Sequence, residues 1–191
     1  GIRRRFGNFY WRPVRGEATI ALFSPAFRGP ARGDPRRLTF AGFTWHEGVR
    51  EDGEPALDPR LERFLDAGDP PVVVSPGTIK AHAVGELFDA ALAACRAAGR
   101  RAVLVTGHAH DGRFDGLDDA IRVDYAPYSA LLPRAAMMVN HGGTGTFSWA
   151  LRARRPMVVM PMAYDQFDHA ARLERHGVAL SEPLRTLTPD G

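Results

Sequence analysis

Strands and helices alternate along residues 70–181 of this 191-residue chain, and no other feature restricts its fold as strongly. Short apolar runs typical of buried strands are followed by longer segments in which apolar residues recur every three or four positions, as in a helix. A strand, a crossover helix and a second strand form a right-handed unit with parallel strands. We therefore predict an α/β fold with a doubly wound, Rossmann-like parallel sheet. Strands are expected at residues 72–75, 101–106, 121–123, 135–140, 156–160 and 178–180, and helices at 80–98, 129–132, 144–153 and 166–176.

The region before this alternation has a different character, because it is rich in glycine, proline and arginine. Short strands are expected at residues 19–23 and 38–43, and a short helix at 59–65. We place the domain boundary so that residues 1–67 end one domain and provide a linker, while residues 68–191 form the Rossmann-like domain. The chain lacks an initiator methionine and ends on a helix-start signal, so we expect it to be part of a larger fold, truncated at both ends.

Composition excludes several classes of protein. The hydrophobic fraction of 45% suits a packed core, and no apolar run is long enough to cross a bilayer or to form a signal peptide. A cytoplasmic location is the simplest expectation. The single cysteine, Cys95, cannot form an internal disulfide and is expected to be a small buried helix residue. The arginines are scattered rather than interleaved with aromatic residues, which argues against nucleic acid as a partner.

One turn in the expected sheet combines several groups that bind anions. It joins the strand at 135–140 to the helix at 144–153 and reads His141-Gly142-Gly143-Thr144-Gly145-Thr146. A helix start offers free backbone N–H groups and the positive end of the helix dipole, and glycines let an anion approach the backbone. The imidazole and the threonine hydroxyls add donors. The turn therefore predicts a phosphate site, although a His-Gly-Gly turn taken alone is about as often purely structural.

Further polar residues follow the other expected strands, and ligands of open parallel sheets bind beyond the carboxyl ends of strands. These residues are Gly77 and Thr78, His108 and His110, residues 125–128, and Tyr164 with Asp165 and Gln166. The pair His108 and His110 is a weak metal signal, because no cysteine or glutamate partner accompanies it. The other histidines, His46, His82, His169 and His176, show no partner pattern and are expected at the surface or in packing.

Taken in order, these residues resemble the nucleotide-sugar signature of the family 1 glycosyltransferases of the GT-B fold. That family holds plant and animal UDP-glycosyltransferases and bacterial enzymes that glycosylate lipids, sterols and natural products. The bacterial branch with lipid-like or polyketide-like acceptors is most similar. The resemblance spans residues 72–180 and rests on the turn at 141–146, on Ala150-Leu151, Pro156, Pro161 and Asp165-Gln166, and on Tyr125-Ala126-Pro127-Tyr128 with Leu131-Leu132-Pro133 upstream.

This resemblance implies the donor-binding half of an inverting, metal-independent hexosyltransferase that needs no cofactor. It would transfer a hexose from a UDP- or TDP-sugar to a hydroxyl of a small lipophilic acceptor. The implied diphosphate contacts are His141, Gly142, Gly143, Thr144, Gly145, Thr146, Gly77 and Thr78. The base would contact Tyr125, Pro127 and Tyr128, and the sugar Asp165 and Gln166.

The resemblance also implies that the catalytic base and the acceptor pocket belong to an N-terminal domain, supplied in cis or in trans. We therefore expect the chain alone to bind its donor weakly and to transfer nothing. Two alternatives stay open: a nucleotide-sugar-binding module without activity of its own, and a GT-B-like epimerase.

Two positions depart from the signature. Trp149 stands where a glutamate usually grips the ribose, and we expect it to pack in the core instead. Arg154 and Arg155 replace the usual glycine before Pro156, and we expect them at a solvated helix end.

Overall fold

The computed structural model describes residues 18–47, 56–77, 83–107, 112 and 114–183, and the chain divides into two units, residues 1–44 and 45–191. In the first unit, β1 (Thr19–Ala21) and β2 (Leu38–Phe40) pair in parallel. Aromatic edge contacts and an ion pair between Arg28 and Asp34 accompany these strands. Both strands were expected from the sequence, and both are shorter than expected. The proposed boundary between residues 67 and 68 stays a prediction.

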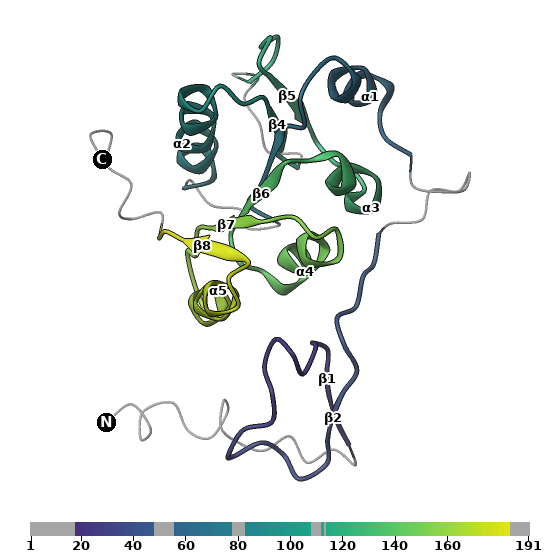
Figure 1. Ribbon diagram of the computed structural model, residues 1–191, viewed down its shortest axis with the longest axis vertical. Coiled ribbons are helices and arrows are strands. Elements are labelled where there is room, and N and C mark those ends of the chain that lie inside the picture. Colours follow the sequence, from purple (N-terminus) through teal and green to yellow (C-terminus); the bar gives the residue numbers. More distant parts are fainter. Residues whose placement is uncertain (1–17, 48–55, 78–82, 108–111, 113, 184–191) are drawn as a thin grey trace. The chain divides into compact units, whose positions relative to one another are not determined.

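The second unit is an α/β structure with one six-stranded sheet (Figure 1). All of its strand pairs are parallel, in the order β5-β4-β3-β6-β7-β8, which confirms the predicted doubly wound sheet. Its elements are α1 (Pro59–Asp66), β3 (Val72–Ser75), α2 (Ala83–Ala97), β4 (Ala102–Val105), β5 (Ala120–Val123), α3 (Tyr128–Leu131), η3 (Leu132–Arg134), β6 (Met137–Asn140), α4 (Thr144–Arg152), β7 (Met157–Val159), α5 (Gln166–Arg175) and β8 (Ala179–Ser181).

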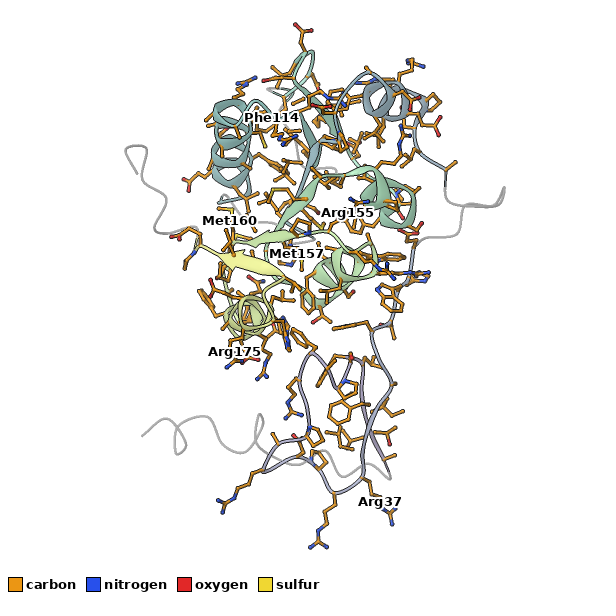
Figure 2. The ribbon with its side chains drawn as sticks, viewed as in Figure 1. Arg37, Phe114, Arg155, Met157, Met160 and Arg175 are labelled. Carbon is orange, nitrogen blue, oxygen red and sulfur yellow. The ribbon has the colours of Figure 1, made fainter. Side chains whose placement is uncertain are left out.

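The neighbouring interior strands β3 and β4 are buried along their whole length, as their apolar runs predict for a sheet covered on both faces. Helix α2 lies on one side of this sheet, and α1, α3 and α4 lie on the other (Figure 1). The core beneath α2 includes Phe88, Cys95, Phe114 and Met160, of which the last two are labelled in Figure 2. The prediction that Cys95 is a small buried helix residue is confirmed.

The strand order reverses between β3 and β6, and this reversal positions the candidate site. The chain runs from β3 outward through β4 to β5, then returns to β6 on the other side of β3. Ser75 at the end of β3 lies opposite Asn140 at the end of β6, so both strands end at the same level. The helices that follow these strands, α2 after β3 and α4 after β6, lie on opposite sides of the sheet (Figure 1), and such a divergence is where open α/β sheets bind their ligands.

Helix α4 ends in a Schellman motif whose residue in the left-handed region is an arginine. The Arg155 N–H donates to the Ala150 carbonyl at 2.9 Å and the Arg154 N–H donates to the Leu151 carbonyl at 3.1 Å. Arg154 has φ +56°, a conformation that glycine adopts at little cost. Its side chain is exposed, as expected. The same expectation is wrong for Arg155, which is half-buried because its guanidinium reaches back to donate to the Pro133 carbonyl at 2.6 Å.

We predict that Arg154→Gly stabilises the protein by about 0.5–1 kcal/mol, because a residue with a Cβ pays roughly 1–2 kcal/mol in the left-handed region while glycine loses more chain entropy on folding. Urea unfolding followed by tryptophan fluorescence measures the change. Arg154→Ala is the matched control, since it removes the same charge and keeps the Cβ. An equal gain in the alanine variant would assign the effect to the side chain and contradict the backbone explanation.

Within the described ranges, no helix is both long and apolar enough to cross a membrane.

Candidate functional site

The centre of the candidate site is the imidazole of His141, which lies between two glycines from different loops. A Cβ placed on Gly77, after β3, would come within 2.3 Å of the His141 Cε1 atom. A Cβ on Gly143, at the start of α4, would come within 2.3 Å of the His141 Nε2 atom. Real Cβ atoms do not approach other atoms so closely, so only glycine fits at either position. The ring therefore joins the two loops that diverge where the strand order reverses.

The turn after His141 is held by side chains of its neighbours. Asn140 is fully buried, and its Oδ1 atom accepts the Gly142 N–H at 2.8 Å. Gly142 has φ +87°, and a Cβ there would lie 3.0 Å from Val159 Cγ1 and 3.2 Å from the Gln166 carbonyl oxygen. On the other side, His169 Nδ1 lies 2.8 Å from the Gly142 carbonyl oxygen. Both backbone polar groups of Gly142 are thus bonded within the chain.

Helix α4 begins at Thr144 with Gly143 as its N-cap, and no side chain caps it. The Thr146 N–H donates to the Gly143 carbonyl at 2.9 Å. The first N–H groups of a helix have no acceptor within the helix, and in α4 these are the N–H groups of Gly143, Thr144 and Gly145. The first turn holds no acidic residue, so the positive end of the helix dipole is not offset there. This end of α4 can therefore attract an anion.

The pKa of His141 depends on the charges around its ring. Burial lowers the pKa of its imidazole, and neighbouring Asp165 opposes this while His169 adds to it. At neutral pH the ring is therefore uncharged and donates through one nitrogen. Its Nδ1 atom is buried and has no hydrogen-bond partner among the described residues. A nearby negative charge favours the protonated ring, so an anion bound here would raise the pKa of His141.

Asp165 and Gln166 lie at the start of α5, next to this turn. The Asp165 side chain is 72% exposed, whereas Gln166 is buried. The Gln166 Oε1 atom accepts the backbone N–H groups of Met162 and Ala163 at 2.9 and 3.0 Å. The side-chain oxygen of Gln166 therefore holds the loop before α5. The amide nitrogen is the side-chain group with which Gln166 could bind a ligand.

The predicted base-contact residues follow β5. Tyr125 is 59% exposed, whereas Pro127 is buried. Tyr128 is half-buried, and its hydroxyl lies 2.6 Å from Ser75 Oγ at the end of β3. Burial raises the pKa of the Tyr128 phenol, although the Ser75 hydrogen bond opposes this shift. The hydrogen bond ties the loop after β5 to the strand that leads to Gly77.

Some predicted residues lie outside the described part of the chain: Thr78 of the diphosphate set, and His82, His108 and His110. Among the described residues, sequence reasoning missed two that shape the turn, Asn140 and His169. The prediction that His169 is a surface or packing residue is confirmed as far as packing goes, because its ring meets the Phe147 ring edge-on. The prediction missed that a ring nitrogen of His169 also bonds the turn directly. The signal was its position four residues after Asp165, which places both side chains on one face of α5.

Trp149 is buried, as predicted for core packing. Its ring centroid lies 6.3 Å from that of Trp45, and the Arg152 guanidinium lies over both rings at 5.1 and 4.9 Å. Trp45 Nε1 donates to the Ser148 carbonyl at 3.1 Å. The second half of α4 is thus packed with aromatic groups, while its first turn carries uncapped backbone N–H groups.

A parallel sheet in this order, with an amide-rich helix start where the order reverses, defines the class of Rossmann-like nucleotide-binding proteins. More specifically, the chain belongs to the family described as erythromycin biosynthesis protein CIII-like, C-terminal domain, which matches residues 92–191. This is the C-terminal domain of family 1 glycosyltransferases, as the sequence resemblance predicted.

Named relatives agree with this assignment. The O-mycaminosyltylonolide 6-deoxyallosyltransferase of Streptomyces fradiae is 46% identical over 122 residues, which are 63% of this chain and 28% of that protein. The crystal structure of the glycotransferase of kitacinnamycin is 27% identical and superposes with a TM-score of 0.69 over 91% of this chain and 44% of its own. The glycosyltransferase VinC, solved in complex with dTDP, is 28% identical with a TM-score of 0.57 over 73% and 35%. The chain spans less than half the length of each.

We predict that Gly143→Ala destabilises the protein by about 1–3 kcal/mol, the usual range for overpacking, because the new methyl group would overlap the His141 ring. Gly143 has negative φ, so the effect is steric rather than conformational. The free energy of unfolding in urea measures it, and a double-mutant cycle with His141→Ala should recover most of the loss.

Gly145→Ala is the control for this cycle, because a Cβ at that position of the same helix meets no atom within 4 Å. It should be neutral or slightly stabilising, since alanine favours helices over glycine. If Gly143→Ala were as harmless as the control, the ring would not be confined as described.

Proposed function

We propose that this chain is the donor-binding part of a glycosyltransferase that transfers a hexose from a UDP- or TDP-sugar to a hydroxyl of a small lipophilic acceptor, with inversion and without a metal. The proposal rests on the family assignment and on one observation. The His141 ring, confined between Gly77 and Gly143, stands beside the uncapped start of α4. An imidazole and uncapped backbone N–H donors thus lie together at the point where open α/β sheets bind their ligands.

The chemistry of glycosyl transfer suits these groups. The sugar passes through an oxocarbenium-like state while negative charge grows on the departing diphosphate. Fixed N–H groups and an imidazole stabilise that charge without having to reorganise, and they can supply the positive potential that a divalent cation supplies elsewhere. His141 and the amides of Gly143, Thr144 and Gly145 are the proposed diphosphate contacts, with Gly77, Thr78 and the two threonine hydroxyls beside them.

The remaining donor contacts are proposed from their places around this turn. Tyr125, which is exposed after β5, offers a ring on which a base can stack, with Pro127 and Tyr128 beside it. Asp165 presents an exposed carboxylate that can accept hydrogen bonds from sugar hydroxyls, and Gln166 can donate through its amide nitrogen. VinC, a relative solved with dTDP, supports a thymidine donor among the two considered.

The catalytic base and the acceptor pocket are proposed to come from an N-terminal domain, in cis or in trans, in the cytoplasm. We accordingly predict that the 191-residue chain binds a nucleotide sugar weakly and yields no glycosylated product by mass spectrometry, because the base is proposed to lie in the other domain. Turnover by the chain alone would contradict this. For a longer protein that includes the other domain, a glycosylated acceptor supports transfer, an epimerised free sugar supports the epimerase alternative, and neither product supports a binding module.

We predict that His141→Ala weakens dTDP or UDP binding about 10- to 100-fold, the loss expected for one hydrogen bond to a charged group. Isothermal titration calorimetry of the 191-residue chain measures it. His176→Ala is the control and should bind as the wild type does, because His176 is the exposed C-cap of α5, at the opposite end of that helix from Asp165. Equal affinity of wild type and His141→Ala would remove His141 from the site.

A further inference from the structure

We infer that His169 is a positioning residue for the diphosphate-binding turn, a role that rests on the function proposed above. His169 lies on α5 and is not among the proposed donor contacts. Its Nδ1 atom lies 2.8 Å from the Gly142 carbonyl oxygen, and its side chain is 13% exposed. Its ring also meets the Phe147 ring edge-on, with centroids 5.3 Å apart. A half-buried imidazole thus lies against both α4 and the turn that precedes it.

The partner of His169 fixes its tautomer. A carbonyl oxygen can only accept a hydrogen bond, so Nδ1 must carry the hydrogen. In the neutral ring, Nε2 then carries a lone pair. That atom lies 3.7 Å from the Asp165 carboxylate, to which it cannot donate. Neutral His169 therefore holds the turn without engaging the carboxylate that is proposed to meet the sugar.

The hydrogen bond sets the direction of an amide in the proposed site. The Gly142 carbonyl and the Gly143 N–H belong to one planar trans peptide, so they point in opposite directions. Holding the carbonyl toward His169 turns the Gly143 N–H away from α5. Asn140 fixes the preceding peptide through the Gly142 N–H at 2.8 Å. The two side chains together lock a residue with φ +87°, which has no side chain of its own to anchor it.

The test compares two replacements of His169. His169→Phe keeps an aromatic ring against Phe147 and removes the donor. His169→Asn loses the ring but can place an amide N–H near the position of Nδ1. We expect His169→Phe to weaken dTDP binding about three- to tenfold by calorimetry, in line with one neutral hydrogen bond, and His169→Asn to stay closer to the wild type. Melting temperatures without ligand provide the readout for a structural role.

The outcomes of these binding measurements distinguish failure of the positioning role from failure of the proposed function. If His169→Phe binds dTDP as the wild type does while His141→Ala does not, the positioning role fails and the proposed function stands. If both His169 variants weaken binding in proportion to their loss of melting temperature, His169 is only structural and the inference fails. If the wild type binds neither dTDP nor UDP, the proposed function fails first.

A second measurement needs no ligand. Nitrogen-15 shifts of the histidine rings, recorded at pH 8 where neutral rings dominate, report which nitrogen of His169 carries the hydrogen. The geometry requires the Nδ1–H form. Finding the Nε2–H form would overturn the inference whatever the binding data show.

Discussion

The confinement of one imidazole between two glycines is the contact on which the rest of the site depends. Gly77 and Gly143 lie 66 positions apart in the numbering, yet the His141 ring leaves no room for a Cβ on either. Because interiors are close-packed and yield little, such a contact fixes the distance between the loops after β3 and β6. It also orients the ring by shape rather than by hydrogen bonds, since its Nδ1 atom has no partner among the described residues. The imidazole is thus placed before any ligand arrives, and its nitrogen atoms are not committed to holding it in position.

The sheet makes this contact reachable. Ser75, Asn140 and Val159 lie side by side at the ends of three neighbouring parallel strands, so the loops that follow begin at one level. The order of the strands reverses between β3 and β6, and such a reversal is where open α/β sheets bind their ligands. Asn140 and His169 then fix the turn after β6, because Asn140 accepts the Gly142 N–H and His169 bonds the Gly142 carbonyl. The strand order thus determines where the candidate site lies, and the side chains of Asn140 and His169 determine the conformation of its turn.

The sequence could predict the fold well because its evidence is local. Apolar runs and helical periodicity placed each described strand and helix of the six-stranded sheet within a few residues, and β3 at its observed bounds. The anion-binding turn was also recognisable, since its residues are contiguous. The sequence did not predict that the His141 ring lies between Gly77 and Gly143, or that Asn140 and His169 bond Gly142 from both sides. These contacts join residues that only the fold brings together. Nothing in the sequence distinguishes His169 from His176 except its spacing from Asp165, and Arg155 looked like a solvated helix end because Pro133 lies on another element.

The two halves of α4 show how one helix can be stabilised while the N–H groups of its first turn stay uncapped. Helix starts are commonly capped by a serine, threonine, aspartate or asparagine that occupies the free N–H groups. Here the N-cap is Gly143, no carboxylate lies in the first turn, and Arg152 in the last turn complements the dipole. The stability that a cap would supply comes instead from the other end, where Trp149, Trp45 and Arg152 stack and Trp45 bonds the Ser148 carbonyl. A carboxylate at position 149 could not join this stack. The aromatic packing at its second half therefore stabilises α4 without a side-chain cap on the end that is proposed to receive a diphosphate.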